Sequence, residues 1–426
     1  MNDRCVPVTE VQSASKRANA RESASIRPCY LALCLGLIGA APAVAWAEGI
    51  WTPFAAEDIE HNSNVFDLNK NGPEPIGKNG ATFADTFFET RAGIDGTYLL
   101  DQQKFFGTAE FRRFDYENFT DLDHNEVLLD GGLKWKLLHA LDGALEYRHE
   151  ERMVQFLNLA ASTEFILEIE NIANASVNID FTPEWRLESR ARDRLLDSPR
   201  TDTPGLSLHE DSIHEGLRYL GVSNLSAGFD AEYLEGRYNH DPTALTPDYH
   251  QTTLAFAANY LVSGFTSFRG NVGYTRRTDP TNLGLSAITG SIAYQHNITG
   301  KTSMNLQLSR NASTYITTGG NELDTSAALS LTWQASYKIA VKGGYSYTNS
   351  KYPETPDGTI FINRVDHFQI ASAEVDYQVL RWLSIRPYVH YQTRHSNDQT
   401  YTFTGTIAGI EFLAKEPRPA APLTLR

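Results

Sequence analysis

Residues 175–187 read ASVNIDFTPEWRL, and this stretch contains the repeating unit of the whole chain. Its first seven residues alternate between apolar and polar side chains, which is the pattern of a β-strand with one apolar and one polar face. The alternation ends at the aromatic Phe181, and a three-residue link leads to Trp185, where a second alternating segment begins. The stretch therefore predicts two strands joined by a tight turn, with an aromatic side chain beside the turn.

The same unit recurs along the chain at intervals of roughly 40 residues. In each copy an aromatic residue ends one strand, and a new alternating strand starts within a few residues. Rows of aromatic side chains are typical of membrane–water interfaces, so we predict an interfacial girdle on the periplasmic side of a barrel. Its members are Tyr98, Trp135, Phe181, Tyr219, Tyr260, Tyr294, Trp333 and Tyr377.

Longer segments rich in turn-forming residues separate these hairpins, and we predict that they are mobile outer loops. They include residues 69–80, 197–205, 239–248, 277–284, 317–321 and 349–359. Short turns at one end and long loops at the other are typical of bacterial barrels, which have an even number of strands. We therefore predict an all-β, transmembrane, antiparallel up-and-down barrel of about 18 strands, with a range of 16–20. A soluble sandwich or propeller also alternates but does not explain this asymmetry.

The N-terminus predicts export from the cytoplasm. Five basic residues precede an apolar run at residues 30–40, and Ala45-Trp46-Ala47 has the small-x-small pattern of a cleavage site. We expect Sec-type export and a signal peptide spanning residues 1–47. The apolar run is shorter than the ~20 residues of a membrane-spanning anchor. A lipoprotein is disfavoured because Leu33 stands before Cys34, where a small residue is needed. The barrel then spans residues 48–412, and a Pro- and Ala-rich tail spans residues 413–426.

Composition excludes several functional classes. All three cysteines, Cys5, Cys29 and Cys34, lie in the predicted signal peptide, so no disulfide or cysteine chemistry is expected. The remaining chain has 32 basic and 49 acidic side chains, a net charge near −17, which disfavours nucleic acid as a partner. The 12 histidines show no metal-binding pair at helical spacing, and no Gly-x-Ser-x-Gly elbow occurs. We expect no metal, no cofactor and no enzymatic activity.

Charged side chains share the polar face of several strands in the N-terminal half. Alternation places this face in the lumen, because an arginine facing lipid at mid-bilayer costs about 2–4 kcal/mol. The predicted lumen-lining residues are Glu146, Arg148, Glu150, Arg152, Arg186, Glu188, Arg190, Arg192, Arg194 and Arg218. Asp180, Asp230 and Glu232 extend this set, whereas the C-terminal half presents Asn305, Gln307, Ser309, Ser330 and Thr332. The sequence thus predicts one charged wall and one neutral wall.

Two interpretations of the charged wall remain open. It is either a set of salt bridges that satisfies a wet interior or a guide for a polar or anionic polymer, since guanidinium groups suit carboxylates and sugar hydroxyls. Between residues 186 and 194 four arginines share one face of the strand with a single carboxylate, Glu188, which alone cannot neutralise them. Glu146, Glu150 and Asp180 are candidates for partial neutralisation across strands.

The segment Asp58-Ile59-Glu60-His61-Asn62-Ser63-Asn64-Val65-Phe66 resembles the first strand of the β-barrel porin type 2 family. More closely, it looks like the exosortase-associated outer-membrane proteins of exopolysaccharide biosynthesis. Residues 105–116 (FFGTAEFRRFDY), 181–187 (FTPEWRL) and 234–238 (LEGRY) are also similar to hairpins of that family. The resemblance implies a barrel that takes part in exopolysaccharide production or export, although this chain continues past Phe412, where family members often end.

The leading functional hypothesis is a non-enzymatic channel of the Gram-negative outer membrane that exports an exopolysaccharide. Its partners would be outer-membrane lipid, lipopolysaccharide, the polysaccharide and periplasmic components of an export system, with no nucleic acid. A general diffusion porin for small polar solutes is the first alternative. A barrel hydrolase acting on lipopolysaccharide or polymer and a surface adhesin remain as alternatives from other classes.

Overall fold

The computed structural model describes residues 49–72, 74–80, 82–154, 156, 163, 165–198, 206–238, 248–280, 284–315, 320–352 and 363–416. The predicted signal peptide lies outside these residues. The strands that run toward the long loops are β1 (Gly49–Asn62), β3 (Gln103–Tyr116), β5 (Leu141–Met153), β7 (Trp185–Ser198), β9 (Leu225–Tyr238), β11 (Thr266–Thr278), β13 (Thr302–Tyr315), β15 (Ile339–Tyr352) and β17 (Leu383–Ser396).

The returning strands alternate with them along the chain. They are β2 (Asp85–Leu100), β4 (His124–Leu137), β6 (Leu167–Thr182), β8 (Leu206–Val222), β10 (Tyr249–Ser263), β12 (Ser286–Thr299), β14 (Gly320–Gln334), β16 (Arg364–Leu380) and β18 (Phe403–Lys415). The described residues also form the 3-10 helices η1 (Lys78–Gly80), η2 (Thr120–Leu122) and η4 (Gln399–Tyr401). None of the described helices has the length and hydropathy needed to cross a membrane.

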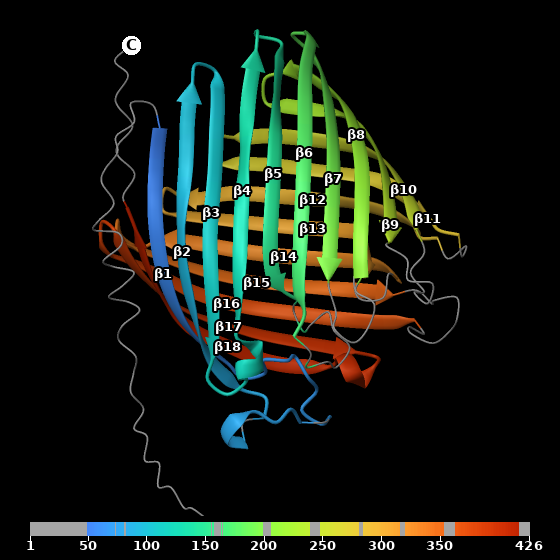
Figure 1. Cartoon of the computed structure of the whole chain (residues 1–426). Coiled ribbons are helices and arrows are strands. Elements are labelled where there is room, and N and C mark those ends of the chain that lie inside the picture. Colours follow the sequence, from blue (N-terminus) through green and yellow to red (C-terminus); the bar gives the residue numbers. More distant parts are fainter. Residues whose placement is uncertain are drawn as a thin grey trace, which may run out of the picture.

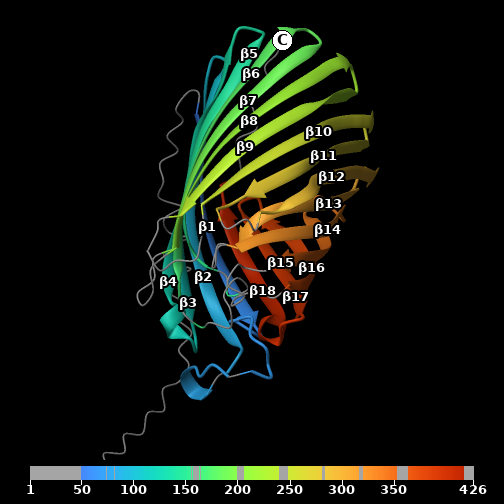
Figure 2. The same cartoon turned by 90° about the vertical axis from the view of Figure 1, so that its right-hand side faces the viewer.

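All 18 strands form one closed antiparallel barrel. Each strand pairs with its neighbours in the chain, and β1 pairs with β18 to close the ladder. Strands of the near wall run steeply in Figure 1 while those of the far wall cross behind them, as expected for strands that tilt against the barrel axis. The turned view shows the same oblique course of β5 to β11 (Figure 2). Closure confirms the predicted fold and strand number.

The connections follow the predicted asymmetry. Links from even-numbered to odd-numbered strands contain two to four residues, whereas links from odd to even strands contain six to 22, except for the four-residue link between β13 and β14. In the near wall of Figure 1 the short turns lie at the upper end of the barrel and the long loops at the lower end. The first strand begins and the last strand ends at the short-turn end, because β1 and β18 pair in antiparallel register. This end is the one predicted to face the periplasm.

Several strand ends differ from the sequence-based boundaries. The last strand continues to Lys415, three residues past Phe412, because its final residues still pair with β1. The strands β7 and β15 also extend into segments predicted to be loops. At this rim of β15 the guanidinium of Arg364 stacks 3.7 Å from the ring of Tyr352, and both side chains are buried. Such packing extends the ladder beyond the point where the turn-forming residues alone would end it.

The first long loop packs into a cluster at the long-loop end, although the sequence predicts mobile loops there. Phe66 lies edge-on to Phe119 and Phe156, with 4.8 Å between ring centroids in each pair. The buried Asp85 carboxylate accepts hydrogen bonds from the backbone of Asn118 and Phe119. We call this the loop cluster, and its buried members are Val65, Phe66, Leu68, Phe83, Tyr116, Phe119, Leu122, Val154, Phe156 and Ile166.

A tyrosine reinforces the closure between β1 and β18. Tyr388 of β17 extends across β18, and its Oη lies 2.8 Å from Oδ2 of Asp58 and 2.7 Å from Oε2 of Glu60. The crossing occurs at Gly409, where an added Cβ would lie 2.5 Å from the tyrosine ring. A residue larger than glycine there would displace Tyr388. Two residues of the segment that resembles the porin family, Asp58 and Glu60, therefore take part in closing the barrel.

The outer surface is apolar along the strands. Phe229, Leu254 and Ile288 are 68%, 61% and 65% exposed, and polar neighbours on the same strands face inward. This inverts the usual arrangement of a water-soluble fold, in which large apolar side chains are covered. All eight predicted girdle aromatics occupy outward-facing positions near the short-turn ends of the even-numbered strands. Their place in a membrane interface remains a prediction.

Candidate functional site

The ten charged residues predicted to line the lumen all occupy inward-facing positions. On β5, for example, Leu145 and Tyr147 are each 52% exposed on the outer surface, while Glu150 lies on the inward face and is buried. The registers of β5, β6, β7 and β8 carry the same alternation across the sheet. We call these ten residues the charged wall.

Arg194 is fixed by carboxylates on both neighbouring strands. Its Nε lies 2.6 Å from Glu170 on β6 and its Nη1 lies 2.6 Å from Glu210 on β8. Tyr249 donates a further hydrogen bond to Glu210. Only 17% of the Arg194 side chain is exposed, so this arginine is a cross-link within the wall.

Two further arginines near the short-turn end are also paired. Arg186 lies 2.6 Å from Asp180, and Arg218 lies 2.6 Å from Asp230 and 3.4 Å from Glu188. We call Arg186, Arg190, Arg192 and Arg194 the arginine row. Glu188, which lies among them on β7, therefore pairs with Arg218 of the next strand. The salt-bridge interpretation describes this part of the wall.

The carboxylates of β5 pair within their own neighbourhood and do not neutralise the arginine row. Glu150 lies 2.9 Å from Arg148 and 3.1 Å from Arg152, and Glu146 has Lys134 at 4.0 Å. Among the three candidates named from the sequence, only Asp180 reaches the row. The partners that the sequence analysis missed are Glu168, Glu170 and Glu210. The alternation in residues 167–172 and 206–212 already placed these glutamates on the polar face. Only the pairing of neighbouring strands shows that Glu168 lies beside Arg152 and that Glu170 and Glu210 lie beside Arg194.

Arg190 and Arg192 differ from the rest of the charged wall. In the part of the chain that the structure describes, neither guanidinium makes an ion pair or a hydrogen bond, and both side chains are exposed on the inward face. Their register neighbours are uncharged or weakly basic: Ser176 and His214 beside Arg190, and Asn174 and Ser212 beside Arg192. Two unneutralised positive charges thus lie about halfway along β7.

The neutral wall lies on β13 and β14. Its side chains face inward as predicted, and hydroxyl groups pair with one another across strands, as Ser309 and Ser326 do at 2.6 Å. A similar chain on the adjoining strands joins Thr253, Thr275 and Thr289 at 2.9 and 2.7 Å. The neutral wall is defined by Asn305, Gln307, Ser309, Ser330 and Thr332.

This arrangement suits the passage of polar molecules. Barrels of 16–18 strands are wide enough to leave an aqueous channel between their walls. The exposed guanidiniums of Arg190 and Arg192 can bind carboxylate, sulfate or phosphate oxygens bidentately. The amides and hydroxyls of the neutral wall can exchange hydrogen bonds with sugar hydroxyls or water. Together they form a polar path in which Arg190 and Arg192 have no ion-pair partner among the described residues.

Comparisons with solved structures return barrels of similar extent. The outer membrane protein OpdK from Pseudomonas aeruginosa is 10% identical, with 87% of this chain and 98% of that chain covered at a TM-score of 0.45. The siderophore receptor PirA from the same organism is 9% identical, with 86% and 80% covered at 0.44. OccAB3 from Acinetobacter baumannii is 9% identical, with 87% and 100% covered at 0.45.

At these identities and TM-scores the three likenesses carry no argument about function, and the fold rests on the closed ladder itself. No known family description and no curated protein matches the chain. The resemblance to the β-barrel porin type 2 family therefore rests on the residues quoted above.

Proposed function

We propose that the protein is a non-enzymatic channel of the outer membrane that passes hydrophilic molecules through its lumen. The observation that carries this proposal is the inverted barrel, with apolar side chains outside and charged or hydroxylated side chains inside. In a bilayer, a closed barrel satisfies every backbone hydrogen bond without an exposed edge. The eight aromatics at the short-turn end would then lie at the periplasmic interface, where such side chains are enriched.

The transported molecule is proposed to be anionic or rich in hydroxyl groups. Arg190 and Arg192 support this assignment, because two unpaired guanidiniums in a confined polar path attract anions more strongly than they would in open water. An exopolysaccharide that bears carboxylates has both kinds of group and is the specific candidate. The support for a polymer is the resemblance of residues 58–66 to proteins of exopolysaccharide biosynthesis. Small polar anions fit the same features, so a diffusion porin is the second candidate.

The decisive electrical experiment uses purified protein in planar bilayers. The wild type is expected to conduct ions, and R190Q/R192Q is expected to lower its anion-to-cation permeability ratio several-fold, because two positive charges are removed from the lumen. The matched control is R310Q, which removes an arginine from the outward face of β13 and should leave the ratio unchanged. No conductance by correctly folded wild type would contradict a channel, and an unchanged ratio in R190Q/R192Q would contradict the anion path.

A genetic experiment separates polymer export from general diffusion. Deletion of the gene is expected to abolish cell-surface polysaccharide, and expression of R190Q/R192Q is expected to restore it only in part. A deletion strain with normal polysaccharide and reduced uptake of small anions would support the diffusion porin instead. An unchanged result in both assays would contradict both candidates.

A further inference from the structure

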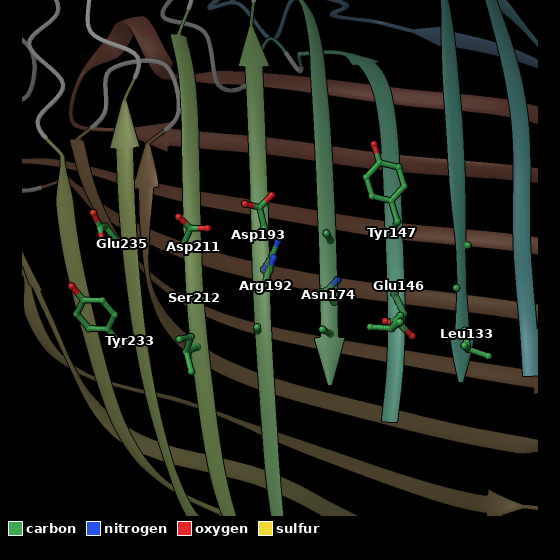
Figure 3. A pocket seen from close by; sticks show the side chains of 17 residues that line it. Leu133, Glu146, Tyr147, Asn174, Arg192, Asp193, Asp211, Ser212, Tyr233 and Glu235 are labelled. Atoms are coloured by element: carbon green, nitrogen blue, oxygen red, sulfur yellow. The ribbon is translucent and has the colours of Figure 1, made fainter. Parts of the chain in front are cut away.

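The outer wall of the barrel contains a hollow that the channel function does not use. It spans β4 to β9 and measures about 860 Å³, and its outward-facing lining side chains place it on the exterior of the wall. Its floor consists of small outward-facing residues, Gly131, Ala173, Ala175 and Ala191, and larger side chains such as Tyr147 and Ile213 border it. Figure 3 shows it from outside, with the opposite wall behind it.

Three carboxylates lie side by side at the end of this hollow that is nearer the long loops, which is uppermost in Figure 3. Asp193 of β7 is directly opposite Asp211 of β8, and Asp211 is directly opposite Glu235 of β9. Like charges placed directly across a sheet are unfavourable without counter-charges. Asp193 and Asp211 also contribute to the lining of the hollow, so the acidic residues and the apolar floor form one continuous surface.

His209 converges with two of these carboxylates in a geometry that suits a metal ion. Its Nε2 lies 2.7 Å from Oδ2 of Asp193 and 3.6 Å from Oδ1 of Asp211. The three ligand atoms all lie within 4.8 Å of one another. Arg237 lies 2.8 Å from the other oxygen of Asp211, so it orients this carboxylate and leaves Oδ1 facing the histidine. An imidazole and two carboxylates are a common ligand set for Zn²⁺, and three protein ligands leave one coordination position open.

The height of this cluster on the barrel indicates what would fill the open position. On the short-turn side of the cluster the outward residues of β7, β8 and β9 are mostly apolar, as Ala191, Ile213 and Tyr233 are, and the polar exceptions Ser189 and Glu215 hydrogen-bond to each other at 2.6 Å. On the long-loop side of the cluster they are mostly polar, as His209, Arg237 and Asp197 are, with Leu195 as the apolar exception. The cluster therefore lies near the long-loop boundary of the apolar belt, where the proposed membrane would place the phosphates of its outer-leaflet lipids. Arg237 pairs with Asp211 at 2.8 Å and with Glu235 at 3.0 Å, and a bound divalent cation would remove the remaining repulsion between Asp193, Asp211 and a lipid phosphate.

We propose that this face binds a phosphorylated, multiply acylated glycolipid of the outer leaflet through a bridging divalent cation. Asp193, His209 and Asp211 hold the cation, a phosphate oxygen of the lipid completes its coordination, and an acyl chain lies in the hollow below. This inference rests on the proposed membrane location. It assigns the protein a specific lipid site on its exterior, separate from the transport path.

The first test measures the cation alone. Calorimetric titration of untagged, full-length protein in detergent with Zn²⁺ is expected to give one tight site. D193N/D211N is expected to weaken it at least ten-fold, while the matched control D197N, on the same outward face of β7, leaves it unchanged. Heat-modified migration in gels confirms that each variant is folded. Equal binding by wild type and D193N/D211N would overturn the proposal.

The second test adds the lipid. Purified lipid A in mixed micelles is expected to bind wild type in the presence of Zn²⁺ and to dissociate with a chelator, whereas lipid A without phosphates should bind weakly. A191F fills the floor of the hollow and is expected to reduce lipid binding while leaving Zn²⁺ binding intact. Metal binding without any effect on lipid affinity would overturn the bridge.

Bilayer conductance measured on the same preparations tests the proposed channel separately from the lipid site. D193N/D211N and A191F alter only outward side chains, so their conductance and ion selectivity are expected to match the wild type. A wild type that binds Zn²⁺ and lipid but does not conduct would contradict the channel and leave the lipid site standing.

Discussion

The charged wall and the neutral wall have the same strand geometry and the same apolar exterior, yet they differ in what holds their inward faces together. On β7 two of the four arginines are cross-linked by carboxylates of neighbouring strands, with Arg194 between two glutamates as the clearest case. On β13 and β14 the contacts are between neutral hydroxyls and amides. The same strand geometry therefore accepts either ion pairs or neutral hydrogen bonds on its inward face.

The largest effect is expected from breaking a buried cross-link of the charged wall. Arg194→Gln leaves Glu170 and Glu210 close together without their shared cation, and removing one partner of a buried pair typically costs about 3–5 kcal/mol. We expect a marked fall in the denaturant midpoint for unfolding from detergent micelles. Arg190→Gln is the matched control and should change the unfolding free energy by less than about 0.5 kcal/mol, because its side chain has no ion-pair partner among the described residues.

Equal destabilisation by these two variants would show that position on β7, and not pairing, decides stability. Equal stability would show that water in the lumen screens the Arg194 pairs, as it does for exposed ion pairs.

The second prediction transfers charge from one wall to the other. In the R190Q/R192Q background, Gln307→Arg places a guanidinium on the exposed neutral wall. Because a confined lumen responds to its summed charge, we expect roughly half of the lost anion preference to return. Reversal potentials under a salt gradient measure this. Failure to recover any preference would mean that Arg190 and Arg192 act through local binding and not through the field of the lumen.

A smaller effect is expected from the hydroxyl chain beside the neutral wall. Thr275→Val removes the central member and leaves the hydroxyls of Thr253 and Thr289 without it. A typical hydrogen bond contributes about 1 kcal/mol, and leaving a buried partner unsatisfied adds to that loss. We expect a destabilisation of about 1–2 kcal/mol by the same denaturant assay, with unchanged ion selectivity. A loss as large as that of Arg194→Gln would contradict the contrast between the walls.

The smallest effect is expected at an exposed position of the neutral wall. Asn305→Ala removes an amide that faces the lumen and has no structural partner among the described residues. Stability and selectivity should both stay within about 0.5 kcal/mol of the wild type. A reduced affinity for oligosaccharide in the same variant, measured by current blockade, would identify this amide as part of a sugar-binding surface.

Much of the barrel could be predicted because its signals are local. Alternation with a period of two reports which side chains share a face, as Glu146 and Arg148 do, and the aromatic before each short turn reports the turn. Strand ends at the long loops were harder, because packing such as Arg364 on Tyr352 extends a strand without a local signal. The loop cluster was also not predicted. Its members come from three separate connections, and their apolar side chains become buried only when these connections pack against one another.

The sequence by itself determined that the chain is a barrel with a charged and a neutral inward face, because each side chain's direction follows from its place in the alternation. It could not determine which charges are neutralised. That depends on which strands are neighbours and in what register: Glu170 and Glu210 reach Arg194 only because β6, β7 and β8 pair as they do. The same register leaves Arg190 and Arg192 opposite serine, histidine and asparagine, and so only the tertiary structure separated the arginines that hold the wall together from those that can meet a solute.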